Sequence, residues 1–244
     1  MARTIRSKDT MKIAVLNYTG TVGKTTIAAH LLSPRMGDAP IFAVETINET
    51  AAGLGVDVEQ IRGQKFRELF TKLLKLDDAI IDVGASNIEA FLDGVVKMDG
   101  SHSEIDYFIV PLTPKTKDQK ETIHLISTLS DMGVPSEKIR VVFNRVEADV
   151  SEEFPYVLAY AKKEKTCIAN TDAAIFENDL FDALGVKKLT VSALLADETD
   201  YKALLRKPDA SEKERNNWAE LHGLKLLARG VNRNLDAVYD VLFK

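Results

Sequence analysis

Short unbroken runs of apolar residues recur along the chain, separated by stretches in which apolar residues stand three or four positions apart. An unbroken apolar run is typical of a strand that is covered on both faces of a sheet. The runs predict strands over Lys12–Asn17, Ile41–Val44, Ala79–Val83, Tyr107–Leu112 and Ile139–Phe143, and a short strand near Cys167–Ala169.

The intervening stretches predict helices, because apolar residues at a spacing of three or four share one helical face. Strands that alternate with helices predict an α/β fold, with a mostly parallel central sheet and helices on both faces. We expect one domain over residues 1–244, with C-terminal helices, from about residue 194 to residue 244, packed on it. The expected helices are Lys24–Leu32, Ile61–Leu74, Ile88–Val96, Asp118–Met132, Tyr156–Lys163, Ala173–Leu184, Leu194–Leu205, Trp218–Arg229 and Asn234–Phe243.

The segment between the first strand and the first helix, Asn17–Thr26, has the composition of a phosphate-binding loop. Backbone N–H groups of such a loop, and of the helix that follows, face a phosphate chain. Glycines permit the tight turn, Lys24 supplies a positive charge to the β- and γ-phosphates, and the Thr25 hydroxyl can bind Mg²⁺. The strict G-x-x-x-x-G-K-[ST] pattern fails, because Tyr18 stands at its first glycine. The other interpretation is an ordinary glycine turn capped by threonine.

The same segment resembles the deviant P-loop of the ParA/MinD ATPases, which is written x-K-G-G-x-G-K-T-[ST]. Thr21 replaces a glycine of that motif, and Thr19 stands where the family has a second lysine. The resemblance implies a P-loop NTPase fold with ATP and Mg²⁺ as cofactors. The residues that it assigns to ATP binding are Gly20, Thr21, Val22, Gly23, Lys24, Thr25 and Thr26.

Later segments resemble further motifs of this family in the same order, so that the resemblance covers about Lys12–Arg145. Ala79–Gly84 resembles a strand that ends in an acidic motif, where Asp82 would orient the Mg²⁺ shell through water. Val141–Arg145 resembles the strand whose terminal Asn144 recognises the adenine edge. The other interpretation of Asn144 is a cap on the turn after the strand.

The family's intermediate acidic motif is matched poorly by Val44–Ile47, in which Glu45 takes the first acidic position and Ile47 the second. The family uses this motif to position the attacking water and to sense Mg²⁺. The resemblance therefore gives Glu45 a catalytic role beside Lys24 and Asp82, and it implies weak hydrolysis. The other interpretation of Glu45 is a surface charge at the end of a strand.

The resemblance implies a Mg²⁺-dependent ATPase that acts in plasmid or DNA segregation or stability, most similar to the compact plasmid-partition proteins. Lys24 and a Mg²⁺ bound to Thr25 would stabilise the charge of phosphoryl transfer, and Asp82 would organise the metal shell. Expected partners are a small DNA-binding protein and, linked by nucleotide, a second copy of the chain. Two alternatives remain, a nucleotide-gated interaction module with little hydrolysis and an ATP-dependent metabolic ligase on the same fold.

Charge and composition narrow the choice of partners. The net charge is −5, whereas Tyr201–Lys244 holds nine Lys/Arg against six Asp/Glu. This region predicts at most weak, sequence-independent DNA binding, and its other interpretation is a solvated helical face. A single cysteine and the lack of long apolar runs predict a cytoplasmic protein without a membrane partner. The candidate DNA contacts are Arg206, Lys207, Lys225, Arg229 and Arg233.

Overall fold

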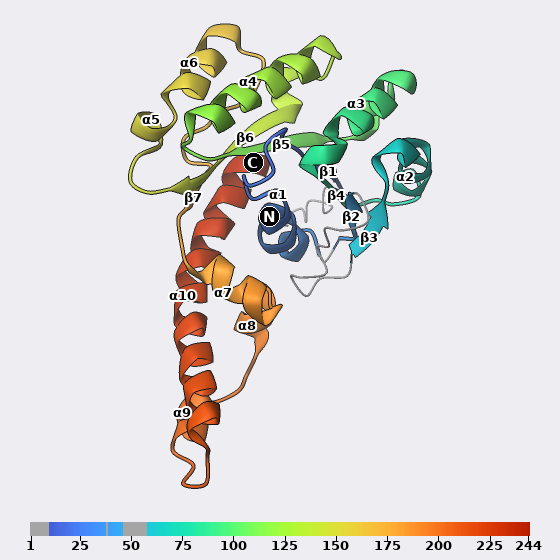
Figure 1. Cartoon of the computed structure of the whole chain (residues 1–244). Coiled ribbons are helices and arrows are strands. Elements are labelled where there is room, and N and C mark those ends of the chain that lie inside the picture. The colour runs from blue at the N-terminus through green and yellow to red at the C-terminus, as the bar shows by residue number, and fades with distance from the viewer. Residues whose placement is uncertain (1–9, 38, 46–57) are drawn as a thin grey trace, which may run out of the picture.

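The computed structural model describes residues 10–37, 39–45 and 58–244, and within these ranges seven parallel strands form one sheet. The strand order is β3–β2–β4–β1–β5–β6–β7 (Figure 1). The predicted α/β fold with a parallel central sheet is therefore confirmed. The strands are β1 Lys12–Val15, β2 Ile41–Val44, β3 Val58–Ile61, β4 Ala79–Val83, β5 Tyr107–Leu112, β6 Ile139–Val146 and β7 Ala174–Phe176.

The central strands lie where the apolar runs predict them, and the two edge strands do not. β3 exposes Glu59 and Gln60, so it lacks an unbroken apolar run, and its last residue lies where the sequence predicts a helix. β7 occupies the start of the segment predicted as the helix Ala173–Leu184. The strand expected near Cys167–Ala169 is only an isolated bridge between Ile168 and Arg140.

A layer of helices covers each face of the sheet (Figure 1). One layer consists of α2 Phe66–Leu73, α3 Ile88–Lys97, α4 Thr116–Asp131, α5 Val150–Glu153 and α6 Pro155–Glu164. The other consists of the P-loop helix (α1 Lys24–Thr26 and the π-helical segment Ile27–Leu32), α7 Leu180–Lys187, α8 Val191–Ala196 and part of α10 Glu212–Phe243. A short helix, α9 Tyr201–Leu205, precedes α10.

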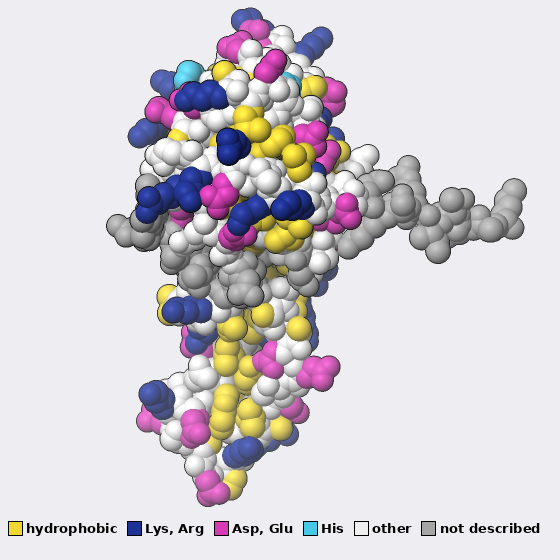
Figure 2. All heavy atoms as spheres, turned by 90° about the vertical axis from the view of Figure 1, so that its right-hand side faces the viewer, with side chains coloured by type: hydrophobic (Ala, Val, Ile, Leu, Met, Phe, Trp, Pro, Cys, Tyr) yellow, Lys and Arg dark blue, Asp and Glu magenta, His cyan; other side chains and the backbone are white. Residues whose placement is uncertain are grey.

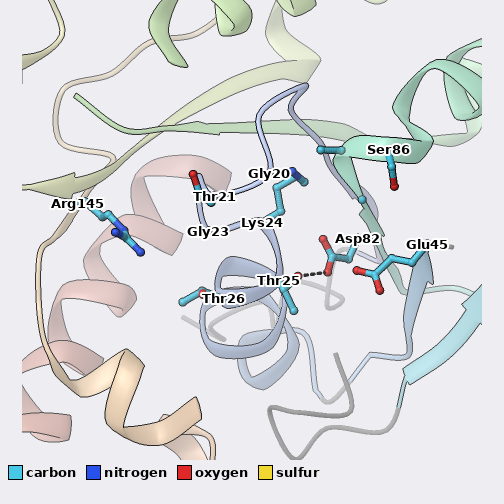
Figure 3. Close-up of a pocket in the computed structure, with 12 residues that line it drawn as sticks. Gly20, Thr21, Gly23, Lys24, Thr25, Thr26, Glu45, Asp82, Ser86 and Arg145 are labelled. Carbon is cyan, nitrogen blue, oxygen red and sulfur yellow. Dashed lines mark hydrogen bonds between the residues drawn. The ribbon is translucent and has the colours of Figure 1, made fainter. Parts of the chain in front are cut away.

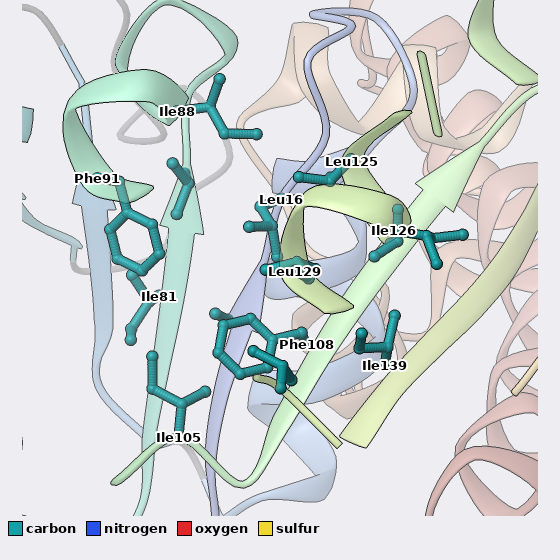
Figure 4. Packing of buried hydrophobic residues seen from close by; sticks show 14 of the residues in the cluster. Leu16, Ile81, Ile88, Phe91, Ile105, Phe108, Leu125, Ile126, Leu129 and Ile139 are labelled. Carbon is teal, nitrogen blue, oxygen red and sulfur yellow. The ribbon is translucent and has the colours of Figure 1, made fainter. Parts of the chain in front are cut away.

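The sheet divides the hydrophobic core into two, because alternate residues of a strand point to opposite faces. Ile13 and Val15 face the P-loop helix and α10, whereas Leu16 and Phe108 face the other layer. Figure 4 shows Leu16 and Phe108 among side chains of α3 and α4 such as Phe91. Each fully buried side chain of this size contributes about 1.5–3 kcal/mol. The sheet is therefore a rigid base for the loops that follow its strands.

The C-terminal region differs from the prediction of two helices, since α10 is one helix of 32 residues. A capping box between Ser211 and Glu214 starts it, and no proline interrupts it. Its C-terminal half is buried against the sheet layer, whereas its N-terminal half runs beyond the sheet beside α9 (Figure 1). We call α9 and residues 206–230 the arm.

Two side-chain contacts fix α10 to the rest of the domain. Asn234 accepts a hydrogen bond from the Phe176 N–H and donates one to the Ala174 carbonyl, at 3.3 and 2.8 Å. It thereby satisfies the outward backbone groups of the edge strand β7, which would otherwise invite another strand to pair. Arg35, at the end of the P-loop helix, pairs with Asp236 at 2.7 Å.

His30 joins the P-loop helix to α7 and α8. Its buried ring lies against Phe181, with the ring centroids 5.6 Å apart. Its Nδ1 accepts a hydrogen bond from the Val191 N–H at 3.2 Å. Burial lowers the pKa of His30 to about 4, because the imidazolium would be poorly solvated there. His30 is therefore neutral in the folded chain over most of the pH range.

We expect the free energy of unfolding to decrease as the pH falls from about 6.5 to about 4, because only the unfolded chain binds a proton at His30 in that window. A shift from 6.5 to about 4 corresponds to about 3 kcal/mol. Chemical denaturation across this range measures the effect. His30→Gln should lose this part of the pH dependence, and the control His102→Gln should keep it. If the free energy of unfolding changed equally with pH in wild type and His30→Gln, the effect would not come from His30.

Candidate functional site

A cavity of about 640 Å³ lies at the carboxyl ends of β1, β2 and β4. Ligands bind at this edge in parallel α/β sheets, because the loops after neighbouring strands meet there. Figure 3 shows residues from separate segments of the chain, the P-loop, Glu45, Asp82 with Ser86, and Arg145, around the cavity. The predicted site residues that line it are Gly20, Thr21, Gly23, Lys24, Thr25, Thr26, Glu45 and Asp82, whereas Val22 is buried and Asn144 lines a neighbouring cavity.

The P-loop (Asn17–Thr26) depends on Gly23, which has a φ of 88°. Side chains rarely tolerate that conformation. A Cβ at Gly23 would also lie 2.3 Å from Nδ2 of Asn144. Gly20 is different, since the nearest atom to a Cβ there is 4.0 Å away. Gly23 is thus the glycine that the loop cannot replace.

Lys24 starts the P-loop helix and is only 4% exposed. Its Nζ donates hydrogen bonds to the carbonyl oxygens of Thr19, at 2.7 Å, and Asn17, at 3.2 Å. A buried ammonium group requires such acceptors. These contacts keep the charge of Lys24 inside the loop, next to the cavity that the loop encloses.

Asp82 and Thr25 form an oxygen-rich pair below the P-loop. The Thr25 hydroxyl donates to Oδ2 of Asp82 at 2.6 Å, as Figure 3 shows. Oδ1 of Asp82 is buried and accepts no hydrogen bond from the residues that the structure describes. Burial raises the pKa of the Asp82 carboxyl, while the Thr25 hydrogen bond and the charge of Lys24 act in the opposite direction. A buried carboxylate oxygen beside a hydroxyl fits a hard cation such as Mg²⁺.

Glu45 follows β2 and lines the same cavity as Asp82. The pairing of β2 with β4 brings the two carboxylates to one edge, since Val44 lies opposite Val83. Figure 3 shows the carboxylate of Glu45 directed toward Asp82. The rest of the intermediate acidic motif, Thr46 and Ile47, lies outside the described residues.

Asn144 has a contact that its sequence position does not reveal. Its Nδ2 donates a hydrogen bond of 2.8 Å to the carbonyl oxygen of Val22. Asn144 also lines a second cavity of about 500 Å³, which shares Gly23, Thr26 and Arg145 with the first. Asn144 therefore holds the P-loop against β6, and its predicted role in adenine recognition stays a prediction.

Sequence reasoning missed two further residues of the site. Arg145 lines both cavities, has a φ of 57° and lies 3.8 Å from the carboxylate of Glu177. A side chain in a left-handed backbone conformation often marks a functional position. Asn17 is buried, donates to the Pro111 carbonyl and to the Thr122 hydroxyl, and accepts from the Thr19 N–H. It ties the P-loop to β5 and α4.

Two negative findings apply to the described ranges. No group of three His, Cys, Asp or Glu residues there is placed to hold a metal ion by itself. Within the same ranges, no helix has both the length and the apolar character needed to cross a membrane.

No protein-family model matches the sequence, and no curated protein matches it. Solved structures do match. The MinD cell division protein of Aquifex aeolicus is 14% identical, with a TM-score of 0.54 over 87% of this chain and 97% of that one. Apo McdA of Cyanothece is 15% identical, with a TM-score of 0.54 over 86% and 98%. A ParA family ATPase of Chlorobium tepidum is 14% identical, with a TM-score of 0.51 over 75% and 90%.

This chain has the ParA/MinD-type fold. The resemblance inferred from the P-loop and the later motifs is confirmed at the level of the fold. At these identities the ParA/MinD-type fold is shown and the activity is not.

We expect Asn144→Ala to lower the free energy of unfolding by about 1 kcal/mol, because a buried hydrogen bond is lost. Amide hydrogen exchange of residues 20–24 should become faster, since the P-loop loses its contact with β6. Asn178→Ala is the matched control, because Asn178 lines the second cavity and, among the described residues, its side chain accepts a hydrogen bond only from the Leu180 N–H. Unchanged exchange in the P-loop of Asn144→Ala would show that this hydrogen bond does not hold the loop.

Proposed function

We propose that the chain binds ATP with Mg²⁺ and hydrolyses it slowly, as a ParA-like ATPase formed by one domain over residues 1–244 with its C-terminal helices. The main support for this proposal is that Lys24, Thr25 and Asp82 line the same cavity. Three parts of a phosphate site from two distant segments would have no reason to converge in an ordinary glycine turn. A neighbour of the same fold, McdA(D38A) of Cyanothece, was solved as an ATP complex.

Each residue has a role that follows from its position. The P-loop and the first turn of the P-loop helix line the cavity, and their N–H groups would hold the phosphates. Lys24 exchanges the carbonyl oxygens of Asn17 and Thr19 for phosphate oxygens. Thr25 and Asp82 would hold Mg²⁺, Asp82 through water, and the ion supplies neutralisation of the phosphate charge.

Hydrolysis is slow in this proposal because the acidic set around the attacking water is incomplete. Glu45 lines the cavity and its carboxylate can accept a proton from water. The neighbouring acidic position of the motif holds Ile47, so Glu45 acts without the second carboxylate. Its side chain is also one methylene longer than that of aspartate, which makes the position of the carboxylate less well defined.

A role in DNA or plasmid segregation, with a small DNA-binding partner and a nucleotide-linked homodimer, is the finer form of the proposal. The support is the fold, together with exposed basic residues in the C-terminal region. Arg206, Lys207, Arg229 and Arg233 are exposed. Lys225 is half-buried and donates to the Asp197 carbonyl, so it is less suited to phosphate contact.

The interaction-module alternative has one observation in its favour, the neutral Thr19 at the position of the family lysine. Phosphate release under saturating ATP and DNA separates it from the ATPase. The metabolic-ligase alternative needs a separate small-molecule site. The second cavity adjoins the first through Gly23, Thr26 and Arg145, so it fits the remaining part of the same nucleotide.

Lys24→Ala should weaken Mg-ATP binding by about 100-fold or more, because several charge-assisted hydrogen bonds to phosphate are lost. Isothermal titration calorimetry measures the affinity, and circular dichroism checks the fold. Lys117→Ala, an exposed lysine on α4, should bind as wild type does. Equal affinities for Lys24→Ala and wild type would remove the basis for the nucleotide site.

We expect ATP to dimerise the wild-type chain poorly, because Thr19 supplies no cation to the phosphates of a facing subunit. An ionic hydrogen bond in such a desolvated site is worth about 1.5–3 kcal/mol. Light scattering with ATP and Mg²⁺ should therefore show tighter dimers for Thr19→Lys. A tight ATP-dependent wild-type dimer that persists when Lys115 and Lys117 are replaced would show that Thr19 does not govern assembly.

A further inference from the structure

The arm leaves several apolar side chains partly exposed. Leu204 and Leu205 of α9, and Trp218 and Leu221 of α10, are only half-buried. Figure 2 shows hydrophobic side chains running along the narrow lower part of the molecule, which contains the arm. A two-helix hairpin has too few neighbours to bury both sides of its helices.

The outer face of α10 adds two leucines to this surface. Leu226 and Leu227 are 52% and 49% exposed, whereas Leu224 and Ala228 of the same helix are buried. α10 therefore carries apolar residues on two faces, and only one of them packs on the domain. Gly223 lies one turn before Leu227, and a Cβ there would have no atom within 4 Å.

A basic row of residues flanks these leucines. Leu226, Arg229 and Arg233 follow one another at spacings of three and four, so they share one side of the helix. Both arginines are exposed, and neither forms an ion pair with another described residue. The segment Lys202–Arg233 holds eight Lys/Arg against four Asp/Glu, although the whole chain has a net charge of −5.

We propose that the outer face of α10, formed by Gly223, Leu226, Leu227, Arg229 and Arg233, binds an amphipathic helix of a partner protein whose apolar stripe is flanked by carboxylates. Leucines bury against the stripe while the arginines pair with the carboxylates, as at the interface between two amphipathic helices. The inference is independent of the ATPase proposal, and it replaces DNA contact at Arg229 and Arg233, leaving Arg206 and Lys207 as the candidates for that contact.

The charge and the apolar exposure of this face favour an acidic amphipathic helix over a second copy of the chain and over nucleic acid. A second copy of the chain would bring another basic arm against this one, and like charges oppose that contact. Nucleic acid would satisfy the arginines but would leave Leu226 and Leu227 in contact with phosphate and water. An acidic amphipathic helix satisfies both kinds of side chain.

Trp218 provides the readout, because it is the single tryptophan of the chain and lies about 12 Å from Leu226 along the helix axis. The full-length protein is titrated with a synthetic helical peptide that has leucines on one face, flanked by glutamates. A twin peptide with lysines for the glutamates and a twin with serines for the leucines are the comparisons. The acidic amphipathic peptide should bind about tenfold or more tightly than either twin.

Variants place the binding on the outer face of α10. Leu226→Gln with Leu227→Gln, and separately Arg229→Glu with Arg233→Glu, should each weaken the acidic peptide about tenfold or more. Val186→Gln and Lys162→Glu, at exposed positions outside this face, should bind as wild type does. If the double glutamine variant loses helicity by circular dichroism, Leu226→Ala replaces it. Lys24→Ala should also bind the peptide normally, which separates this test from that of the nucleotide site.

Three results would overturn the proposal. One is equal affinity of the protein for the acidic peptide and the two comparison peptides, or an affinity for the acidic peptide that the leucine substitutions do not change. The second is a DNA duplex that binds more tightly than the acidic peptide and is unaffected by the leucine changes, which would assign the face to nucleic acid. The third is a dimer in light scattering that the leucine variants abolish, which would assign the face to a second copy.

Discussion

One buried hydrogen bond, from Nδ2 of Asn144 to the carbonyl oxygen of Val22, holds the P-loop on the sheet. The loop has to turn sharply between β1 and its helix, and Gly23 lets it do so with a φ of 88°. Without a Cβ at Gly23, the amide of Asn144 can occupy that space. Asn17 adds a second attachment of the loop, to β5 and α4. The position of Lys24 follows from these two contacts.

The sequence predicts the central strands and therefore most of the site. Buried strands have unbroken apolar runs, and parallel strands bring the segments after them to one edge, where Lys24 and Asp82 meet. The edge strands cannot be predicted in this way, because β3 is half exposed and β7 is only three residues long. The hydrogen bond of Asn144 cannot be predicted in this way either, because the sequence does not show which carbonyl oxygen an asparagine after a strand will bind. The length of α10 depends on burial of residues such as Val231 against the domain, which local sequence does not show.

The P-loop helix is joined to the C-terminal region by more than apolar packing. Arg35 donates hydrogen bonds to Asp236 and to Asn232 of α10, and also to carbonyl oxygens of its own helix. Its side chain is 11% exposed whereas that of Asp236 is 56% exposed, so only the guanidinium side of this ion pair is shielded from solvent. Between Lys24 and Arg35 the chain is partly π-helical, a form that is often found near functional sites. Arg35 thus joins the end of the P-loop helix directly to α10.

The charges around the cavity explain why the proposed ligand needs a divalent cation. Asp82 and Glu45 line the cavity with Lys24 and Arg145, so two carboxylates face two cationic side chains, and Arg145 already lies 3.8 Å from the carboxylate of Glu177. A polyphosphate that entered without a cation would bring further negative charge next to Asp82 and Glu45. Burial of Asp82 makes that repulsion stronger, because solvent screens it poorly. A divalent cation would offset this charge, and the buried Oδ1 of Asp82 is an acceptor, without a hydrogen bond from the described residues, that could take part in holding it. Nucleotide and metal binding should therefore be strongly coupled in this site.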